Sequence, residues 1–149
     1  MATALIIIVA VVAFNAAFIV IQNNRVPALG VTNGQFKPVS NKPNNVSTQT
    51  DVAEKQVATL PFKSTPEATM AAIKKAVETY GGAEIKQETA AYLYVVFTTP
   101  RMKFHDDVEF WLDTQNKAVH FRSSSRAGYS DMGQNRKRYD SLAELYGAL

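Results

Sequence analysis

The sequence contains no cysteine, which excludes disulfide bonds, thiolate metal sites, cysteine nucleophiles and lipid attachment through a thiol. Residues 1–24 also contain no charged side chain. The basic excess is small, with a net charge of +3, and half of the 16 lysines and arginines lie between Arg101 and Arg138. Because nucleic-acid-binding domains usually carry a stronger basic excess on one face, we predict no nucleic-acid partner.

The uncharged N-terminal stretch is a candidate transmembrane helix. Residues 2–21 read ATALIIIVAVVAFNAAFIVI, with Thr3 and Asn15 as the only polar side chains. About 20 helical residues at ~1.5 Å each span the ~30 Å hydrocarbon core of a bilayer. A cleaved signal peptide, with small residues suitable for cleavage at 26–28, is the alternative, but its apolar region would be long and no basic residue precedes it. We therefore expect a single-pass membrane anchor over residues 1–22.

The rest of the chain divides into a linker and one domain. Residues 23–56 are rich in Asn and Gln, contain three prolines and show no sustained hydrophobic periodicity. Such a composition is typical of loops and linkers, so we expect a polar stalk. Residues 57–149 are long enough for one small globular domain with its own core.

The globular part begins with a predicted helix, for which Thr65 is a suitable N-cap, Pro66 suits the first helical position, and the glycines at 81–82 are a stop signal. Four β-strands follow, at residues 83–88, 91–98, 107–113 and 118–124. Their turn residues and apolar–polar alternation predict two hairpins. A final helix is expected from about Met132 to the C-terminus, with Asp131 as its N-cap. The predicted fold is α+β in the order α-β-β-β-β-α, a four-stranded antiparallel sheet with helices on one face.

The apolar faces of the last two strands predict how they pair. Phe110 should lie opposite Phe121, because a slip of one residue would turn Phe121 away from the core. In the same register Glu109 lies opposite Arg122.

The other face of the predicted sheet combines aromatic and basic side chains. Its members are Tyr92, Tyr94, Trp111, His120 and Arg122. Exposed aromatic groups beside a base suit stacking, sugar contact or a partner protein. Cover by a stalk segment from residues 44–62, including Leu60 and Phe62, is an equally good interpretation, and both stay open.

A segment between the last predicted strand and the last predicted helix suits anions. Residues 122–138 read RSSSRAGYSDMGQNRKR and combine five basic residues, four serines and two glycines with the start of a helix. Arginine matches the geometry of carboxylate and phosphate groups, and free N–H groups at a helix start attract negative charge. The candidate ligand-binding residues are Arg122, Ser125, Arg126, Ser130, Asp131, Asn135 and Arg136.

The same residues carry a family resemblance. The stretch FHDDVEF at 104–110 and the segment 122–138 are similar to the signature of the domain of unknown function 1499 family of bacteria and plastids, approximately F-x-D-D-V-E-F and then R-S-x-S-R-x-G-x-S-D-x-G-x-N-R. Residues 44–47 resemble a family stretch P-N-C-V-S, but Asn45 stands where members often carry Cys, so no thiol role is carried over. The resemblance implies an envelope or membrane-associated protein and implies no activity.

The orientation of the domain has two opposing indications. Basic residues follow the apolar helix at Arg25, Lys37 and Lys42 and none precedes it, which favours a cytoplasmic domain. The family resemblance implies the periplasmic side, which we take as the expectation.

We predict a membrane-anchored, non-enzymatic binding or structural module whose arginine-rich segment takes an anionic lipid headgroup or an acidic partner protein, without cofactor or metal. In the purely structural interpretation, Asp106, Asp107 and Glu109, together with Asp131, neutralise the arginines and hold the segment on the sheet.

A hydrolase is the alternative function. It would use a serine of this segment, an aspartate, and either His105 or His120, although no G-x-S-x-G motif is present. A metal ion shared by the two histidines is not expected, because His120 lies mid-strand while His105 precedes its strand.

Overall fold

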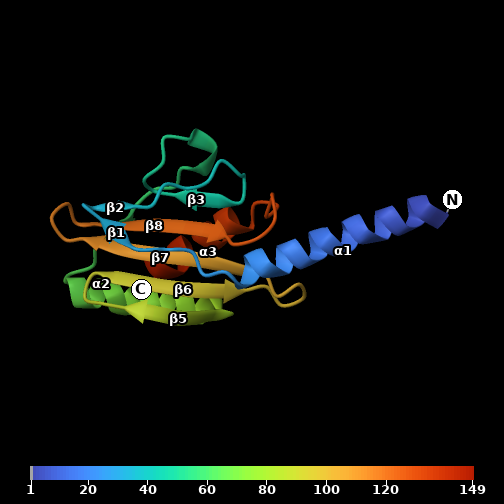
Figure 1. The fold of residues 1–149 in the computed structure, drawn as a ribbon. Helices are drawn as coiled ribbons and strands as arrows, with labels where there is room; N and C mark the ends of the chain where they lie inside the picture. Colours follow the sequence, from blue (N-terminus) through green and yellow to red (C-terminus); the bar gives the residue numbers. More distant parts are fainter. Residues whose placement is uncertain (1) are drawn as a thin grey trace.

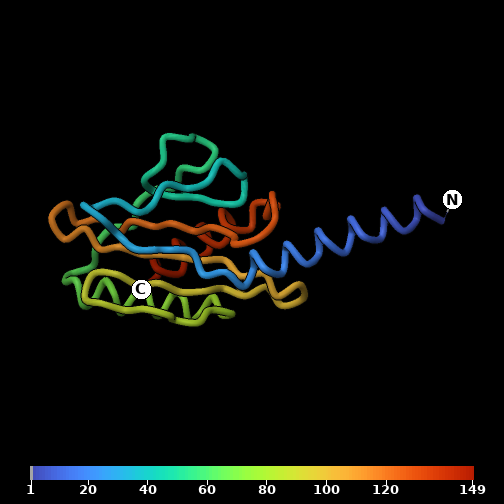
Figure 2. The backbone as a smooth tube through the Cα atoms, viewed as in Figure 1, coloured from blue at the N-terminus to red at the C-terminus, as the bar shows by residue number. Residues whose placement is uncertain are grey.

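A long apolar helix, α1 (Ala2–Asn24), leaves one end of the folded body and extends away from it (Figures 1 and 2). The computed structural model describes residues 2–149. Large apolar side chains are exposed along the whole helix, among them Phe14 and Phe18. The helix is long and apolar enough to span a membrane, as the sequence predicts.

The main sheet has six strands, not the predicted four. Its strands are β3 (Asn45–Ser47), β4 (Leu60–Pro61), β5 (Ala83–Glu88), β6 (Tyr92–Thr98), β7 (His105–Asp113) and β8 (Ala118–Ser125). The path runs β3-β8-β7-β6-β5, all antiparallel, and β4 pairs with β8 next to β3. The two additional strands are short segments that pair with the otherwise free edge of β8, and an unpaired edge is unfavourable.

The predicted register of the last hairpin is confirmed. Phe110 of β7 lies opposite Phe121 of β8 with their rings edge to face, and Glu109 lies opposite Arg122. Because side chains alternate along both strands, Glu109 and Arg122 lie on the face of the sheet opposite to Phe110 and Phe121.

Two helices cover one face of the sheet, as predicted (Figure 1). In α2 (Pro66–Tyr80), the Thr65 hydroxyl accepts from the N–H of Ala68 and so caps the helix. The last helix, α3 (Gln134–Gly147), begins two residues later than expected, and Gly133 in a left-handed conformation occupies the N-cap position. Asp131 lies two residues before the N-cap position, but its carboxylate still accepts from the N–H of Asn135, in the first turn of the helix, at 2.7 Å.

The chain between α1 and β2 lies across the opposite face of the sheet (Figure 1). This segment, residues 25–36, is called the N-terminal strap here, and it contains the small hairpin of β1 (Val31–Thr32) and β2 (Gln35–Phe36). Apolar side chains of the strap pack against Tyr92, Tyr94 and Val96 of β6. The aromatic face is thus covered and is not a free binding surface.

The cover comes from a different part of the linker than expected. Leu60 and Phe62, the predicted covering residues, belong instead to the core between the sheet and the helices. Residues 23–56, expected as a stalk, contribute β1, β2, β3 and a short 3-10 helix (Ala53–Lys55), so the folded body begins before residue 57. The reason is that this polar segment satisfies the edge of β8 and shields apolar side chains of β6 from water.

Candidate functional site

Three carboxylates on β7 each face one arginine. The pairs, with their shortest N–O distances, are Asp106 with Arg138 at 2.6 Å, Asp107 with Arg126 at 2.8 Å, and Glu109 with Arg122 at 2.7 Å. All six side chains are at least nine-tenths buried. A buried charge is costly without a partner of opposite sign, so these pairs hold β8, the segment after it and the start of α3 against β7.

The pair of Asp107 and Arg126 is part of a larger network. Arg126 contacts both oxygens of the carboxylate, and the Tyr94 hydroxyl donates to the same carboxylate at 2.6 Å. Hydrogen bonding to Asp107 raises the pKa of Arg126, and burial together with the Asp107 hydrogen bond raises the pKa of Tyr94. Both carboxylate oxygens of Asp107 are thus held by neighbouring donors, Oδ1 by Tyr94 and Arg126 and Oδ2 by Arg126.

Asn135 joins the end of β8, the loop before α3 and the residue that precedes β3. Its side chain is fully buried, and every polar atom of its amide group is hydrogen-bonded. Its partners are the carbonyl of Asn44, the hydroxyls of Ser123 and Ser125, the carboxylate of Asp131 and the guanidinium of Arg138. The network fixes the end of β8 relative to α3 and β3.

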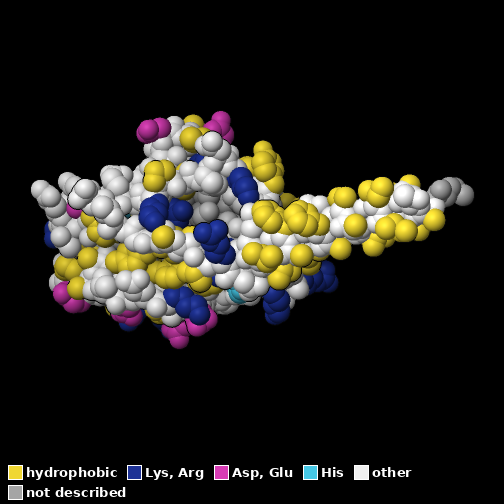
Figure 3. All heavy atoms as spheres, viewed as in Figure 1, with side chains coloured by type: hydrophobic (Ala, Val, Ile, Leu, Met, Phe, Trp, Pro, Cys, Tyr) yellow, Lys and Arg dark blue, Asp and Glu magenta, His cyan; other side chains and the backbone are white. Residues whose placement is uncertain are grey.

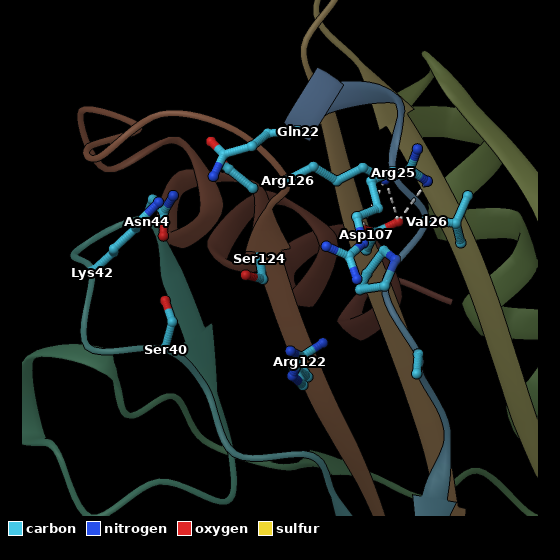
Figure 4. Close-up of a pocket in the computed structure, with 13 residues that line it drawn as sticks. Gln22, Arg25, Val26, Ser40, Lys42, Asn44, Asp107, Arg122, Ser124 and Arg126 are labelled. Atoms are coloured by element: carbon cyan, nitrogen blue, oxygen red, sulfur yellow. Dashed lines mark hydrogen bonds and ion pairs between the residues drawn. The ribbon is translucent and has the colours of Figure 1, made fainter. Parts of the chain in front are cut away.

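A basic cleft of about 610 Å³ opens where α1 enters the folded body (Figure 4). Its walls are the end of α1 with the first residues of the strap, the loop at residues 40–44, and the end of β8. Four basic side chains line it, namely Arg25, Lys42, Arg122 and Arg126, against the single carboxylate of Asp107. This surplus of positive charge suits an anionic ligand.

The basic residues of the cleft differ in how they are neutralised. Arg122 donates through Nη1 to Glu109, but its buried Nε has no hydrogen-bond partner within residues 2–149. Lys42 donates to the carbonyl of Gly128 at 3.1 Å and faces no carboxylate in the described chain. Arg25 is exposed and makes no ion pair with the residues that the structure describes. The net positive charge of the cleft therefore comes from Arg25 and Lys42.

The cleft contains only some of the predicted ligand-binding residues. Arg122, Ser125 and Arg126 line it, whereas Asp131 and Asn135 belong to the capping and hydrogen-bond network of α3. Ser130 and Asp131 line a second hollow on the helix side of the sheet.

Two predicted roles in charge neutralisation are wrong. Asp131 forms no ion pair within residues 2–149 and caps α3 instead. Arg136 does not pair with an aspartate but donates through Nη2 to the carbonyls of Glu54 and Gln56 at 2.9 Å each. Arg138 pairs with Asp106 instead, because α3 turns residue 138 toward the sheet.

Sequence reasoning missed several residues of the cleft. Arg25, Lys42, Asn44 and Ser124 line it together with Gln22 from α1. The one available signal was the position of Arg25 as the first charge after the apolar helix. Nothing in the sequence indicates that residues 40–44 lie beside the end of β8, because that contact depends on the pairing of β3 with β8.

The parts of a hydrolase are not brought together. The hydroxyls of Ser123 and Ser125 bond to Asn135. His105 contacts Thr98, and His120 contacts Thr48 while its ring stacks on that of Trp111. Among residues 2–149 neither histidine hydrogen-bonds to a serine, and no group of three metal-ligating side chains is found.

Comparison with known proteins identifies the family. Residues 35–145 match the family model described as Protein of unknown function (DUF1499). The match runs from β2 into α3 and covers most of the chain, including every carboxylate and arginine of the three buried ion pairs. No curated protein shows a significant match. The chain belongs to the DUF1499 family.

Proposed function

We propose that this DUF1499 protein is a membrane-anchored, non-enzymatic module that binds a phosphate-bearing lipid headgroup in the basic cleft at the base of α1. The observation that carries the proposal is the unbalanced charge of the cleft. Arg122 and Arg126 are each paired with a carboxylate, which leaves the charges of Arg25 and Lys42 for a ligand.

The paired arginines still have a role in binding. Their ion pairs hold the guanidinium groups in fixed positions, so little side-chain entropy is lost when a ligand arrives. The unpartnered Nε of Arg122 belongs to a side chain that lines the cleft. A buried donor without an acceptor is unfavourable, and an anionic ligand that reaches it would remove that penalty.

The position of the cleft favours a lipid headgroup as the source of the phosphate. Gln22, in the last turn of α1, and Arg25, just after its end, both line the cleft. If α1 crosses the bilayer, these residues lie at the level of the headgroups, a layer about 5–7 Å thick on each side of the hydrocarbon core. Basic residues at this level attract anionic lipids by about 1 kcal/mol each.

The contacts of Asn23 support an uncleaved anchor. Its amide donates to the carbonyl of Lys103 at 2.8 Å and accepts from the N–H of His105 at 2.8 Å, and the side chain is buried. Cleavage at residues 26–28 would remove this side chain and leave those two backbone groups without their partner. We therefore take α1 as a permanent single-pass anchor, and we keep the periplasmic side for the domain on the ground of the family resemblance alone.

The test is binding of a short-chain phosphatidic acid to the full-length protein in uncharged detergent, measured by isothermal titration calorimetry. We expect saturable binding, weakened at least tenfold when Arg25 and Lys42 are both replaced by Gln, since losing two charge contacts costs more than about 1.4 kcal/mol. The matched control replaces Lys75 and Lys86, two exposed lysines outside the cleft, by Gln. Equal affinity of the two double variants would refute the proposal.

A further inference from the structure

A second hollow, of about 690 Å³, lies at the same end of the body as the base of α1. Two loops form its walls, the β6–β7 loop at residues 99–104 and the loop at residues 127–134 that leads into α3. The exposed surface of this hollow is more apolar than that of the basic cleft, and Pro100, Met102, Phe104, Ala127 and Met132 supply its apolar side chains. The two loops therefore present an apolar surface where the helix leaves the body.

The tips of both loops carry large apolar side chains that no part of the described chain covers. Met102 is 70% exposed, Tyr129 72% and Met132 89%. Single exposed apolar residues are ordinary on a protein surface, but Met102 and Met132 both line this hollow, and Tyr129 lies on the same loop as Met132. These three side chains are called the patch here. Arg101 and Lys103 flank Met102 and are exposed as well.

The patch is attached directly to α1. Asn23, in the last turn of the helix, bonds to both Lys103 and His105, and Arg126 donates to the Asn23 carbonyl at 3.4 Å. These contacts fix the direction of the helix relative to the loop. In Figures 1 and 2 both loops project from the body on the side toward which α1 extends. Whatever surface surrounds α1 therefore lies in front of the two loops.

We infer that these loop tips form a second membrane contact, in which Met102, Tyr129 and Met132 enter the interface of the bilayer that holds α1. The inference rests on the proposed anchoring by α1. The bilayer is the expected contact of the patch, because α1 is fixed to the β6–β7 loop and a bilayer that surrounds α1 therefore lies next to the patch. Apolar side chains beside basic ones are also the composition of segments that lie in the membrane interface.

The distribution of charge on the surface agrees with this placement. Figure 3 shows hydrophobic side chains along α1, Lys and Arg side chains on the body near the base of the helix, and Asp and Glu side chains at edges of the body away from it.

A second contact would limit how far the helix and the body, which move together, tilt in the bilayer. The basic cleft would then stay open to the headgroup layer, since its wall at Gln22 and Arg25 is attached to the same helix.

Nitroxide labels in the full-length protein, reconstituted into nanodiscs of phosphatidylcholine and phosphatidylglycerol, test the inference. The absence of cysteine allows single-cysteine variants without further changes. Met102→Cys and Met132→Cys report on the loop tips, Val12→Cys on the middle of α1, and Gln115→Cys on the exposed β7–β8 turn at the opposite end of β7. Accessibility to oxygen and to a water-soluble nickel complex gives the depth of each label.

We expect the label at residue 12 to be deep in the hydrocarbon, those at 102 and 132 at interfacial depth, and that at 115 in water. Labels at 102 and 132 as accessible to nickel as the one at 115, with residue 12 deep, would overturn the inference while leaving the anchor in place. That result would also be expected if the patch bound a partner protein. A label at residue 12 in water would overturn both the inference and the anchor.

A second variant tests the apolar contact directly. In a protein labelled at Tyr129→Cys, the exchange Met132→Glu should move the label toward water, because the phosphatidylglycerol surface repels a carboxylate and an apolar contact is lost. Met132→Leu keeps the apolar character and should leave the depth unchanged. Equal depth in the two variants would contradict the proposed insertion.

Discussion

The guanidinium of Arg126 contacts both carboxylate oxygens of Asp107, at N–O distances of 2.8 to 3.1 Å, and also reaches the carbonyl of Asn23 in the last turn of α1. This one pair connects the segment after β8, the strand β7 and the apolar helix. It also forms part of the wall of the basic cleft. The stability of the body and the shape of the candidate site are therefore coupled at Arg126.

Replacing Arg126 by Gln should lower the free energy of unfolding by about 3–5 kcal/mol, because Asp107 would remain buried without its cation. Thermal denaturation of the full-length protein, followed by circular dichroism, measures this loss. Lys75→Gln is the control, since the pair of Lys75 with Glu78 is largely exposed and contributes less than about 1 kcal/mol. Asp107→Asn added to Arg126→Gln should restore part of the loss. A variant at Arg126 as stable as the control would show that the pair is not needed for the fold.

Replacing Asn135 by Ala should be destabilising although the exchange removes few atoms. Each buried polar group left without a partner costs about 1–3 kcal/mol, and Asn135 serves several such groups. Urea denaturation should show a loss of more than about 3 kcal/mol. The neighbouring exchange Gln134→Ala removes one contact of 3.5 Å to Tyr80 and should cost much less. Similar losses for both variants would contradict the central place of Asn135 in the network.

The pKa of His120 should lie below its ordinary value of 6.5, because burial disfavours the charged ring more than Asp113 favours it. An NMR titration of the ring protons measures the midpoint directly. Asp113→Asn should lower it further. Because the unfolded chain binds the proton first, the stability should fall as the pH drops from 6.5 toward the lower folded value and change no further below it. In His120→Gln this part of the pH dependence should disappear, and its persistence would assign it to another group.

The packing of the N-terminal strap can be followed through Trp111, the single tryptophan of the chain. Phe36 of the strap is buried in the cluster against which Trp111 packs. Phe36→Ala should destabilise the protein by about 3–5 kcal/mol and increase quenching of tryptophan fluorescence by acrylamide. Phe62→Ala, on the helix side of the sheet, should leave the quenching unchanged. Unchanged quenching in Phe36→Ala would mean that the strap does not shield this face in solution.

Several features of this fold could be predicted from the sequence because they depend on local spacing. The alternation of apolar residues along β7 and β8 predicted that Phe110 opposes Phe121, since a slip by one residue exposes the apolar side chain to solvent. Thr65 and Pro66 predicted the start of α2 through the preferences of the first helical turn. The family resemblance, carried by the residues around Glu109 and Arg126, is confirmed by the family match.

Other features depend on how distant segments pack. The strands β3 and β4 have three and two residues, too few to show any periodicity. The choice of Arg138 over Arg136 as the partner of Asp106 follows from the placement of α3, because residues two apart on a helix point about 200° apart. The sequence predicted the start of this helix only to within two residues. That precision is too low to tell whether Arg136 or Arg138 faces the sheet.

The sequence by itself determined an apolar N-terminal segment long enough to span a bilayer, the central hairpins of the sheet and a cluster of arginines close to aspartates. Those features follow from composition and from the periods of strands and helices. Only the tertiary structure decided which carboxylate neutralises which arginine and that Arg25 and Lys42 face no carboxylate within residues 2–149. The physical reason is that the cleft combines the end of α1, the loop at 40–44 and the end of β8, which are distant in the sequence. They are adjacent because β3 pairs with the edge of β8 and the N-terminal strap packs on the apolar face of β6.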